Sequence, residues 1–165
     1  MAELRRAARI MAVAGVVLAT IGCDRVTKQM AARHLAGRPR VSLIGDSVRL
    51  VYVENRGGFL SIGSELPGPA RTAVFSVATS ALLAWLGVCV WRGVFAGGWA
   101  LGPALLWAGG AGNLADRLAR GSVVDFLNLG LGGVRTGIFN AADVAITAGV
   151  ALVVFGMIRS DRTEP

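Results

Sequence analysis

Residues 72–91 read TAVFSVATSALLAWLGVCVW, an uninterrupted run without a charged side chain. A helix of about 20 apolar residues is long enough to cross a bilayer core of about 30 Å. Pro69 lies just before the run, where the start of a helix tolerates proline, and Arg92 follows it. The stretch therefore predicts a transmembrane helix.

The composition of the whole chain agrees with a membrane protein. Of its 165 residues, 54% are hydrophobic and 16% are charged, whereas soluble domains carry about 25% charged residues. The net charge of +7 could suggest nucleic acid, but the arginines are scattered between apolar runs without a basic stripe. We therefore expect no nucleic-acid partner, and the length fits a single membrane domain, residues 1–165.

Three further segments are predicted to span the membrane, at about residues 10–35, 94–114 and 139–158. The apolar part of the first ends at Cys23, and a basic start with a short apolar core is also typical of a signal peptide. Because nothing between Cys23 and Leu35 breaks a helix, we favour a longer first helix. The third span is rich in glycine, which lets membrane helices pack closely.

The segment of about residues 40–66 predicts a small β element outside the membrane. Residues 41–44 and 48–53 are rich in β-branched and apolar side chains, and Gly45-Asp46-Ser47 between them is a turn signal. The expected fold class is therefore an all-α membrane protein of four transmembrane helices, with this β element between helices one and two.

The basic residues give two conflicting indications of orientation. Arg5, Arg6 and Arg9 flank the first helix, which usually dominates topology, and they indicate cytoplasmic termini. A raw count of basic residues favours the opposite topology. We expect cytoplasmic termini, with the loops at residues 36–68 and 115–138 on the outer face.

Ionisable residues in or beside predicted spans are functional candidates, because they are costly in lipid. Asp24 and Lys28 are spaced i, i+4 in the favourable order for an ion pair. Asp125 and Asp143 are flanked by apolar residues, which weakens their solvation, and two neighbouring carboxyl groups share a proton. Such a pair can act as base toward a water and as acid toward a peptide, as in an aspartic protease.

The residues alone leave a structural alternative open for both aspartates. Asp125 could pair with Arg117 or Arg120, and Asp143 could cap the fourth helix. The spacing of Cys23, Cys89 and His34 suggests no metal site, so both cysteines are expected to be small buried hydrophobes without a disulfide.

Five short motifs, in order, resemble the lipoprotein signal peptidase family, also called signal peptidase II. They are DRVTK at residues 24–28, NRG at 55–57, GNLADR at 112–117, VVDF at 123–126 and FNAAD at 139–143. The resemblance implies a catalytic pair, Asp125 and Asp143. It also implies supporting or substrate-binding roles for Asn113, Arg117, Asn140, Asn55, Asp24, Lys28, Gly57 and Asp116.

The resemblance further implies an aspartic endopeptidase of the bacterial inner membrane that needs no cofactor. Its substrate would be a prolipoprotein whose cysteine carries diacylglycerol, cut just before that cysteine. Membrane lipids would be its other partner, and we expect a monomer. A transport protein, a non-catalytic assembly factor and a lipoprotein precursor are the rival readings, and the polar residues gathered at one end of the spans argue against transport.

Two loops carry further expectations. The family continues Asn-x-Gly-Ala-Ala-Phe, whereas this chain has Gly58 and then Phe59, so the aromatic residue arrives one position early. Gly57 is expected to serve a backbone conformation with positive φ. Residues 130–137 are glycine-rich and predict a mobile linker between the two aspartates, either a plain loop or one that gates the site.

Overall fold

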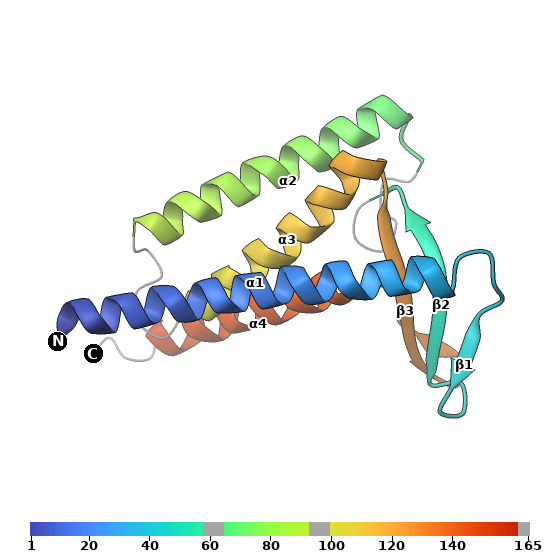
Figure 1. Cartoon of the computed structure of the whole chain (residues 1–165), viewed down its shortest axis with the longest axis horizontal. Coiled ribbons are helices and arrows are strands. Elements are labelled where there is room, and N and C mark those ends of the chain that lie inside the picture. Colours follow the sequence, from blue (N-terminus) through green and yellow to red (C-terminus); the bar gives the residue numbers. More distant parts are fainter. Residues whose placement is uncertain (58–64, 93–99, 162–165) are drawn as a thin grey trace.

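The computed structural model describes residues 1–57, 65–92 and 100–161. Within these ranges, helices run along the long axis of the molecule and a sheet lies across one end (Figure 1). The helices are α1 (Ala2–His34), α2 (Gly68–Trp91), α3 (Leu101–Arg120) and α4 (Ala141–Asp161). The strands are β1 (Val41–Leu43), β2 (Val48–Asn55), β3 (Val123–Leu131) and β4 (Val134–Arg135).

Each predicted span coincides with a helix, although the ends differ. The first helix continues unbroken past Cys23 to His34, which confirms the longer helix. The third runs from Leu101 past residue 114 to Arg120, and its predicted start at residues 94–99 lies outside the described residues. It ends at Gly121, which adopts φ +71° and whose N–H donates to the Arg117 carbonyl at 2.9 Å. In the described residues, Glu3–His34 and Ala141–Arg159 are long and apolar enough to cross a membrane, and Ala73–Cys89 is a shorter apolar helix.

Glycines set the close approach of α3 and α4. A Cβ atom added to Gly109 would lie 2.5 Å from the Ala142 carbonyl oxygen, and one added to Gly149 would lie 2.7 Å from the Gly102 carbonyl oxygen. Any side chain at either position would push the two helices apart. The close packing predicted from the glycines of the third span is confirmed, and it holds the start of α4 against α3.

The sheet is larger than the sequence predicted. Its strands run antiparallel in the order β1-β2-β3-β4, so half of it comes from the segment between α3 and α4. Residues 130–137, predicted to be a mobile linker, contain a short hairpin instead of a plain loop, because Leu131 pairs with Val134 across a tight turn. The predicted mobility and gating stay predictions. In an isolated β1–β2 hairpin, the backbone N–H and C=O groups on the free edge of β2 would lack partners. β3 pairs with this edge.

The two faces of the sheet differ in polarity. Side chains of cross-strand partners point to the same face, and successive residues alternate between faces. One face is therefore polar and carries Ser42, Arg49, Asn128 and Arg135. The other face is apolar, with Val41 beside Leu50 and Leu127, Leu43 beside Val48 and Leu129, and Leu131 beside Val134.

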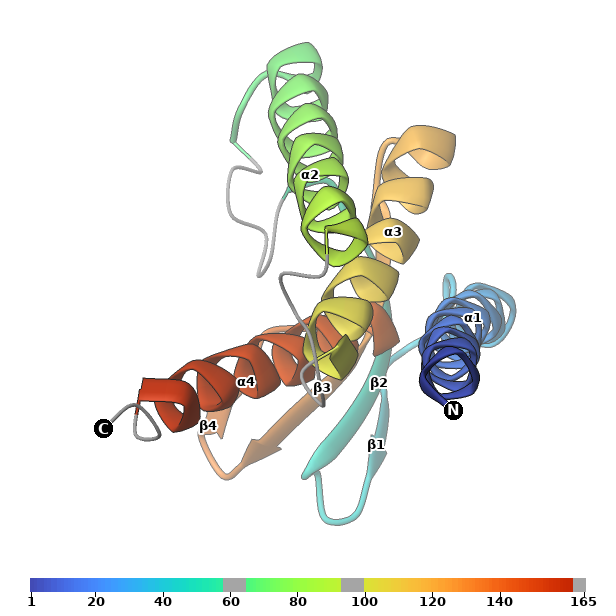
Figure 2. The same cartoon turned by 90° about the vertical axis from the view of Figure 1, so that its left-hand side faces the viewer.

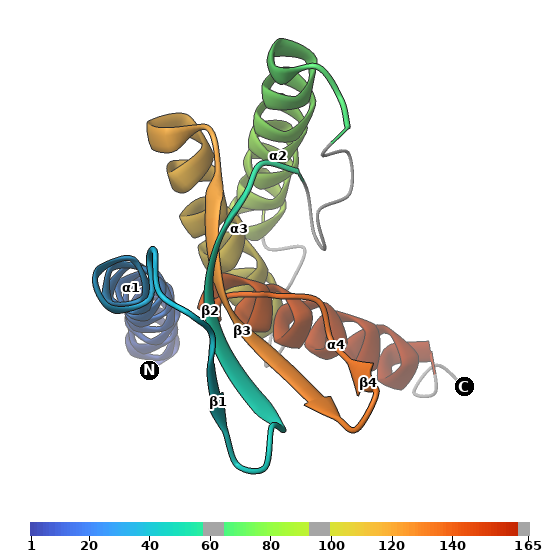
Figure 3. The same cartoon turned by 90° about the vertical axis from the view of Figure 1, so that its right-hand side faces the viewer.

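The polar face is covered by its own arginines. The Nε of Arg135 donates to Asn128 Oδ1 at 2.6 Å, and its Nη1 donates to the Asp46 carbonyl at 2.8 Å. The Nε of Arg49 donates to Asp46 Oδ1 at 2.7 Å in the predicted turn, where Gly45 has φ +57°. These contacts fix the sheet tip, which projects beyond α1 and α4 (Figures 2 and 3).

The cysteines differ from expectation in one respect. Cys23 is exposed on α1, so its predicted burial is wrong, whereas Cys89 on α2 is half-buried. Asp24 and Lys28, further along α1, are the residues that turn toward the other helices, so Cys23 is left on the outer side.

Candidate active site

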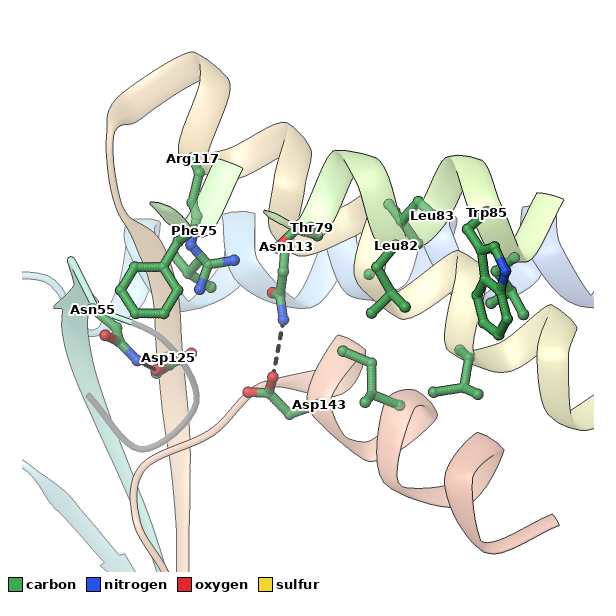
Figure 4. A pocket seen from close by; sticks show the side chains of 15 residues that line it. Asn55, Phe75, Thr79, Leu82, Leu83, Trp85, Asn113, Arg117, Asp125 and Asp143 are labelled. Carbon is green, nitrogen blue, oxygen red and sulfur yellow. Dashed lines mark hydrogen bonds between the residues drawn. The ribbon is translucent and has the colours of Figure 1, made fainter. Parts of the chain in front are cut away.

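A cavity of about 340 Å³ opens between α2, α3, α4 and the bundle end of the sheet (Figure 4). One end is polar and contains Asn55, Asn113, Arg117, Asp125 and Asp143. The remainder is lined mainly by apolar side chains, among them Phe75, Leu82, Leu83, Trp85, Leu106 and Ile146. An apolar cavity with carboxyl groups at one end can hold apolar side chains of a ligand and act on a bond beside them.

Asp125 enters the cavity from β3. Its partner on β2 is Val53, two residues before Asn55. The Nδ2 of Asn55 donates to Asp125 Oδ2 at 2.9 Å. The other oxygen, Oδ1, accepts from Asn140 Nδ2 at 2.7 Å. The residue is only 3% exposed, and its pKa is raised to about 6, because burial together with the charge of Asp143 outweighs the lowering effect of hydrogen bonds such as that from Asn55.

Asp143 enters from the first turn of α4 and is half-buried. Asn113 Nδ2 donates to its Oδ1 at 2.9 Å, and the backbone N–H of Asn140 donates to its Oδ2 at 3.1 Å. In return, the Asp143 N–H donates to Asn140 Oδ1 at 3.0 Å, so the pair forms a reciprocal cap. The structural alternative of a helix-capping Asp143 is therefore correct, and it coexists with a place in the cavity.

Asn140 connects the two aspartates. Its side-chain amide donates to Asp125, while its backbone N–H donates to Asp143. Asn140 is 1% exposed and also donates to Asn113 Oδ1 at 3.2 Å. The positions of the two carboxyl groups are thus fixed relative to one another by a single residue at the start of α4.

A buried charge cluster lies behind Asn113. Lys28 Nζ donates to Asp24 Oδ2 at 2.7 Å and to Asn113 Oδ1 at 2.8 Å, and it lies 2.9 Å from Asp116 Oδ2. Because an ammonium group only donates, the oxygen of the Asn113 amide must face Lys28, which leaves its NH₂ for Asp143. The predicted ion pair between Asp24 and Lys28 is confirmed, and the cluster orients the amide that contacts the carboxyl group.

Asp24 also contacts the helix that carries Asp143. Its Oδ1 accepts the backbone N–H of Ala142 at 3.0 Å, in the first turn of α4. A carboxylate at the start of a helix is stabilised by the helix dipole and by unpaired N–H groups. The polar residues of α1 therefore support the site from the side opposite the cavity.

Within the described residues, Arg117 forms no ion pair with Asp125, which was the structural alternative for that aspartate. Its Nη2 donates to the Gly57 carbonyl at 3.0 Å, and its guanidinium carbon lies 5.9 Å from the centroid of the Phe75 ring. Arg120 contacts Asp116 instead. Arg117 therefore lines the cavity and ties it to the end of β2.

Gly57 lies next to Asn55 in the same turn. Its N–H donates to Asn55 Oδ1 at 2.9 Å, which orients the Asn55 amide so that its NH₂ faces Asp125. The positive φ expected for Gly57 stays a prediction. Gly58 and Phe59, where the sequence departs from the family pattern, lie outside the described residues.

All ten residues singled out from the sequence lie in or directly behind the polar end of the cavity. The apolar wall was not predicted, since Phe75, Leu83 and Trp85 belong to an uncharged run in which no spacing marks one face as a cavity lining. Their position follows only from how α2 packs on α3.

Comparison with known proteins adds independent information. A family model described as signal peptidase (SPase) II matches residues 16–159. The lipoprotein signal peptidase of Caldicellulosiruptor bescii is 32% identical over 90% of this chain and 92% of its own length. That of Streptococcus pneumoniae is 32% identical over 90% and 94%, and that of Mycobacterium leprae 35% identical over 91% and 71%.

Two solved structures share the fold. Both are described as bacterial membrane enzymes determined by the in meso method, at 2.3 Å and 1.9 Å resolution. The first has a TM-score of 0.82 and 25% identity over 94% of this chain and 93% of that chain. The second has a TM-score of 0.76 and 26% identity over 90% and 93%.

Proposed function

The chain belongs to the signal peptidase II family, and from that premise we propose that it is an aspartic endopeptidase with Asp125 and Asp143 as its catalytic pair. It is a peptidase that removes signal peptides from lipoprotein precursors. The finer proposal is that the precursor carries diacylglycerol on its cysteine and that the peptide bond just before this cysteine is cut.

One observation carries the assignment of the aspartates. Asp125 and Asp143 line the same cavity, and Asn140 donates a hydrogen bond to each of them. Carboxyl groups held this way can share one proton, because a second negative charge close by is unfavourable. Their surroundings also differ, which suits one of them to hold the proton and the other to accept one.

The proposed reaction proceeds through a tetrahedral intermediate. The Asp143 carboxylate takes a proton from a water as its oxygen bonds to the scissile carbonyl carbon, and protonated Asp125 donates its proton to the carbonyl oxygen. On collapse, the C–N bond breaks, Asp143 protonates the leaving amine, and Asp125 recovers its proton from the hydroxyl group. Arg117 orients the substrate backbone next to Asn113 and Asn140.

The apolar part of the cavity supports an apolar substrate. Its wall of α2, α3 and α4 side chains is open beside exposed apolar residues such as Trp85 and Leu82, which are 60% and 58% exposed. A signal helix moving in lipid could therefore enter sideways, with its cleavage site at the carboxyl groups. The acyl chains on the precursor would hold it in the same layer.

The proposal includes a membrane arrangement. All four helices span the bacterial inner membrane, with cytoplasmic termini and the aspartates toward the outer face. It is supported by two long apolar helices, by the outward-facing apolar side chains of the helices, and by the membrane enzymes that share the fold. Charged groups collect at the sheet end of the bundle, as expected at a water interface.

The test is cleavage of a diacylglyceryl-modified precursor by the purified protein in detergent. Asp125→Asn and Asp143→Asn should each reduce the rate by at least about 1,000-fold while the protein still inserts into membranes. Asp46→Asn is the matched control, because it makes the same chemical change in the turn between β1 and β2 and should cleave normally. Wild-type rates in both site variants would overturn the assignment.

A further inference from the structure

Thr79 supplies a hydroxyl group to the α2 wall of the cavity. It lies on one face of the helix, at spacings of three and four residues, with the cavity-lining side chains of Phe75, Leu82, Leu83 and Leu86. Thr79 is half-buried, and among the described residues that line the cavity it is the only one with a hydroxyl group. It lies outside the five motifs that carry the resemblance to the family.

The hydroxyl group of Thr79 is not used within its own helix. A threonine in a helix commonly donates to the carbonyl oxygen four residues earlier. Thr27 on α1 and Thr147 on α4 both do so, to the carbonyls of Cys23 and Asp143 at 2.8 Å. Within residues 1–57, 65–92 and 100–161, Thr79 forms no such hydrogen bond, so its hydroxyl group remains available to a molecule in the cavity.

Contacts between α2 and α3 give the depth of Thr79 in the cavity. Near the sheet, the centroid of the Phe75 ring lies 5.9 Å from the Arg117 guanidinium carbon. About two turns further along α2, the Leu83 side chain lies against Gly110, where an added Cβ atom would be 2.8 Å from Leu83 Cδ2. The two helices run antiparallel (Figure 1), so residues midway between these two contacts lie at the same level.

Thr79 is midway between these contacts on α2, and Asn113 is close to midway on α3. The two residues therefore lie at the same level of the bundle, as Figure 4 shows. Asn113 Nδ2 donates to Asp143 Oδ1 at 2.9 Å, and Asn140 connects Asp143 to Asp125. The α2 side of the cavity thus presents a hydroxyl group at the depth of the two carboxyl groups.

A peptide substrate at this depth needs hydrogen-bond partners. For its scissile carbonyl to be reached by water, the signal peptide must leave the helical conformation near the cleavage site, which frees backbone N–H and C=O groups. In apolar surroundings each freed group costs free energy unless a new partner replaces the old one. Threonine suits this task, because its hydroxyl group can donate to a carbonyl and accept from an N–H.

We propose that the Thr79 hydroxyl group hydrogen-bonds to the backbone of the signal peptide just before the scissile bond. The inference rests on the proposed peptidase function and adds a substrate-binding residue to it. The amino side of the bond is favoured because α2 continues from Thr79 to Leu82 and Leu86, in the apolar part of the cavity. An extended chain advances about 3.3 Å per residue, so one helical turn around Thr79 covers roughly two or three residues of substrate.

The test compares Thr79→Val and Thr79→Ser in the cleavage of a diacylglyceryl-modified precursor in detergent. Valine keeps the branched shape and removes the hydroxyl group, so kcat/KM should fall about 10-fold, mainly through KM. Serine keeps the hydroxyl group and should restore most of the loss. Ser80→Ala is the matched control, because Ser80 is exposed in a separate hollow between α2 and α3 and should be dispensable.

Backbone esters in the substrate locate the contact. Synthetic precursors carry an ester in place of the first, second or third amide before the scissile bond, which removes one N–H and weakens one carbonyl acceptor. One of these esters should lower kcat/KM several-fold in the wild type and cost Thr79→Val nothing further. Esters with equal effects in both proteins would overturn the inference.

Two results separate this inference from the proposed function. If the wild type cleaves the all-amide precursor, Asp143→Asn does not, and Thr79→Val cleaves normally, only the role of Thr79 is overturned. If the wild type leaves the precursor intact, the proposed function fails and the inference fails with it. A loss in Thr79→Val that serine does not restore would assign the effect to packing and overturn the hydrogen bond.

Discussion

The two carboxyl groups of the cavity are held by different kinds of structure. Asp125 projects from a strand, is 3% exposed, and accepts hydrogen bonds from the side chains of Asn55 and Asn140. Asp143 projects from the first turn of a helix, is half-buried, and accepts a backbone N–H as well as the Asn113 amide. The start of a helix favours negative charge, whereas burial opposes it.

This difference suggests which aspartate holds the shared proton and which accepts a proton from water in the proposed reaction. Burial raises the pKa of Asp125 to about 6, so this residue is suited to carry the shared proton. Asp143 lines the cavity and accepts hydrogen bonds from the Asn113 amide and the Asn140 backbone N–H, so it is positioned to take a proton from water. The groups around Asp125 on β3 are called the strand side, and those around Asp143 at the start of α4 are called the helix side. The experiments that follow test whether the two sides can be perturbed separately.

The largest effect is expected at Asn140, which serves both sides. Asn140→Ala removes the donor to Asp125 and the cap on α4, and should lower kcat by about 100-fold or more. Loss of the cap should also lower the free energy of unfolding by about 1 kcal/mol. Cleavage assays and thermal unfolding in detergent measure the two effects.

Asn140→Ser provides the matched comparison for that variant. Serine can still cap a helix but lacks the amide donors, so it should restore stability without restoring kcat. Equal recovery of both quantities would mean that the cap alone is important and that Asp125 needs no donor from Asn140.

A smaller effect is expected when the two sides are changed one at a time. Asn55 donates to Asp125, and this hydrogen bond lowers the pKa of that carboxyl group, so Asn55→Ala should raise it. The limb of the kcat/KM profile that reports Asp125 should move to higher pH, with kcat reduced by about 10-fold.

Asn113→Ala removes the corresponding donor to Asp143 and should reduce kcat to a similar extent. In this variant, the limb of the kcat/KM profile that reports Asp125 should lie at the same pH as in the wild type. If both variants shift the same limb in the same direction, the carboxyl groups titrate as one unit, and the division between strand side and helix side breaks down.

The smallest effect concerns stability. The pKa of Asp125 is about 6 in the folded chain against an ordinary 3.8, so the folded state binds the proton more tightly than the unfolded chain. The free energy of unfolding should therefore fall as pH rises from about 4 through about 6. Thermal unfolding across this range should show the fall in the wild type and a shallower one in Asp125→Asn.

Asp46→Asn is the control for that slope. Hydrogen bonding from Arg49 holds the pKa of Asp46 well below its usual range, so its titration is complete before this pH window begins. The variant should keep the wild-type slope, and a slope that vanished in it would place the titrating group elsewhere.

The helices and the polar site could be predicted from the sequence because their signals are local. Twenty uncharged residues, or an aspartate within an apolar pentapeptide, are visible without knowing what lies opposite. Asp125, Asp143 and their supporting residues also fall in motifs that resemble one family, and the family model covers the same stretch.

The second half of the sheet could not be predicted in the same way. Residues 123–131 pair with a strand about 70 positions earlier, and their glycine-rich continuation resembles a loop. The contact between Arg135 and the Asp46 carbonyl depends on that pairing, as does the contact between Asn55 and Asp125. Non-local pairing of this kind is decided by tertiary structure rather than by propensity.

The buried lysine of α1 has a consequence for how the chain is assembled. Lys28 is 2% exposed and pairs with Asp24 one turn earlier in the same helix, while Asp116 and Asn113 reach it from α3. In the proposed membrane placement, α1 would enter the bilayer with the charge of Lys28 already paired within the same helix. The Lys28–Asp24 pair needs no residue from another helix. When α3 packs against α1, Asp116 and Asn113 become additional partners of Lys28.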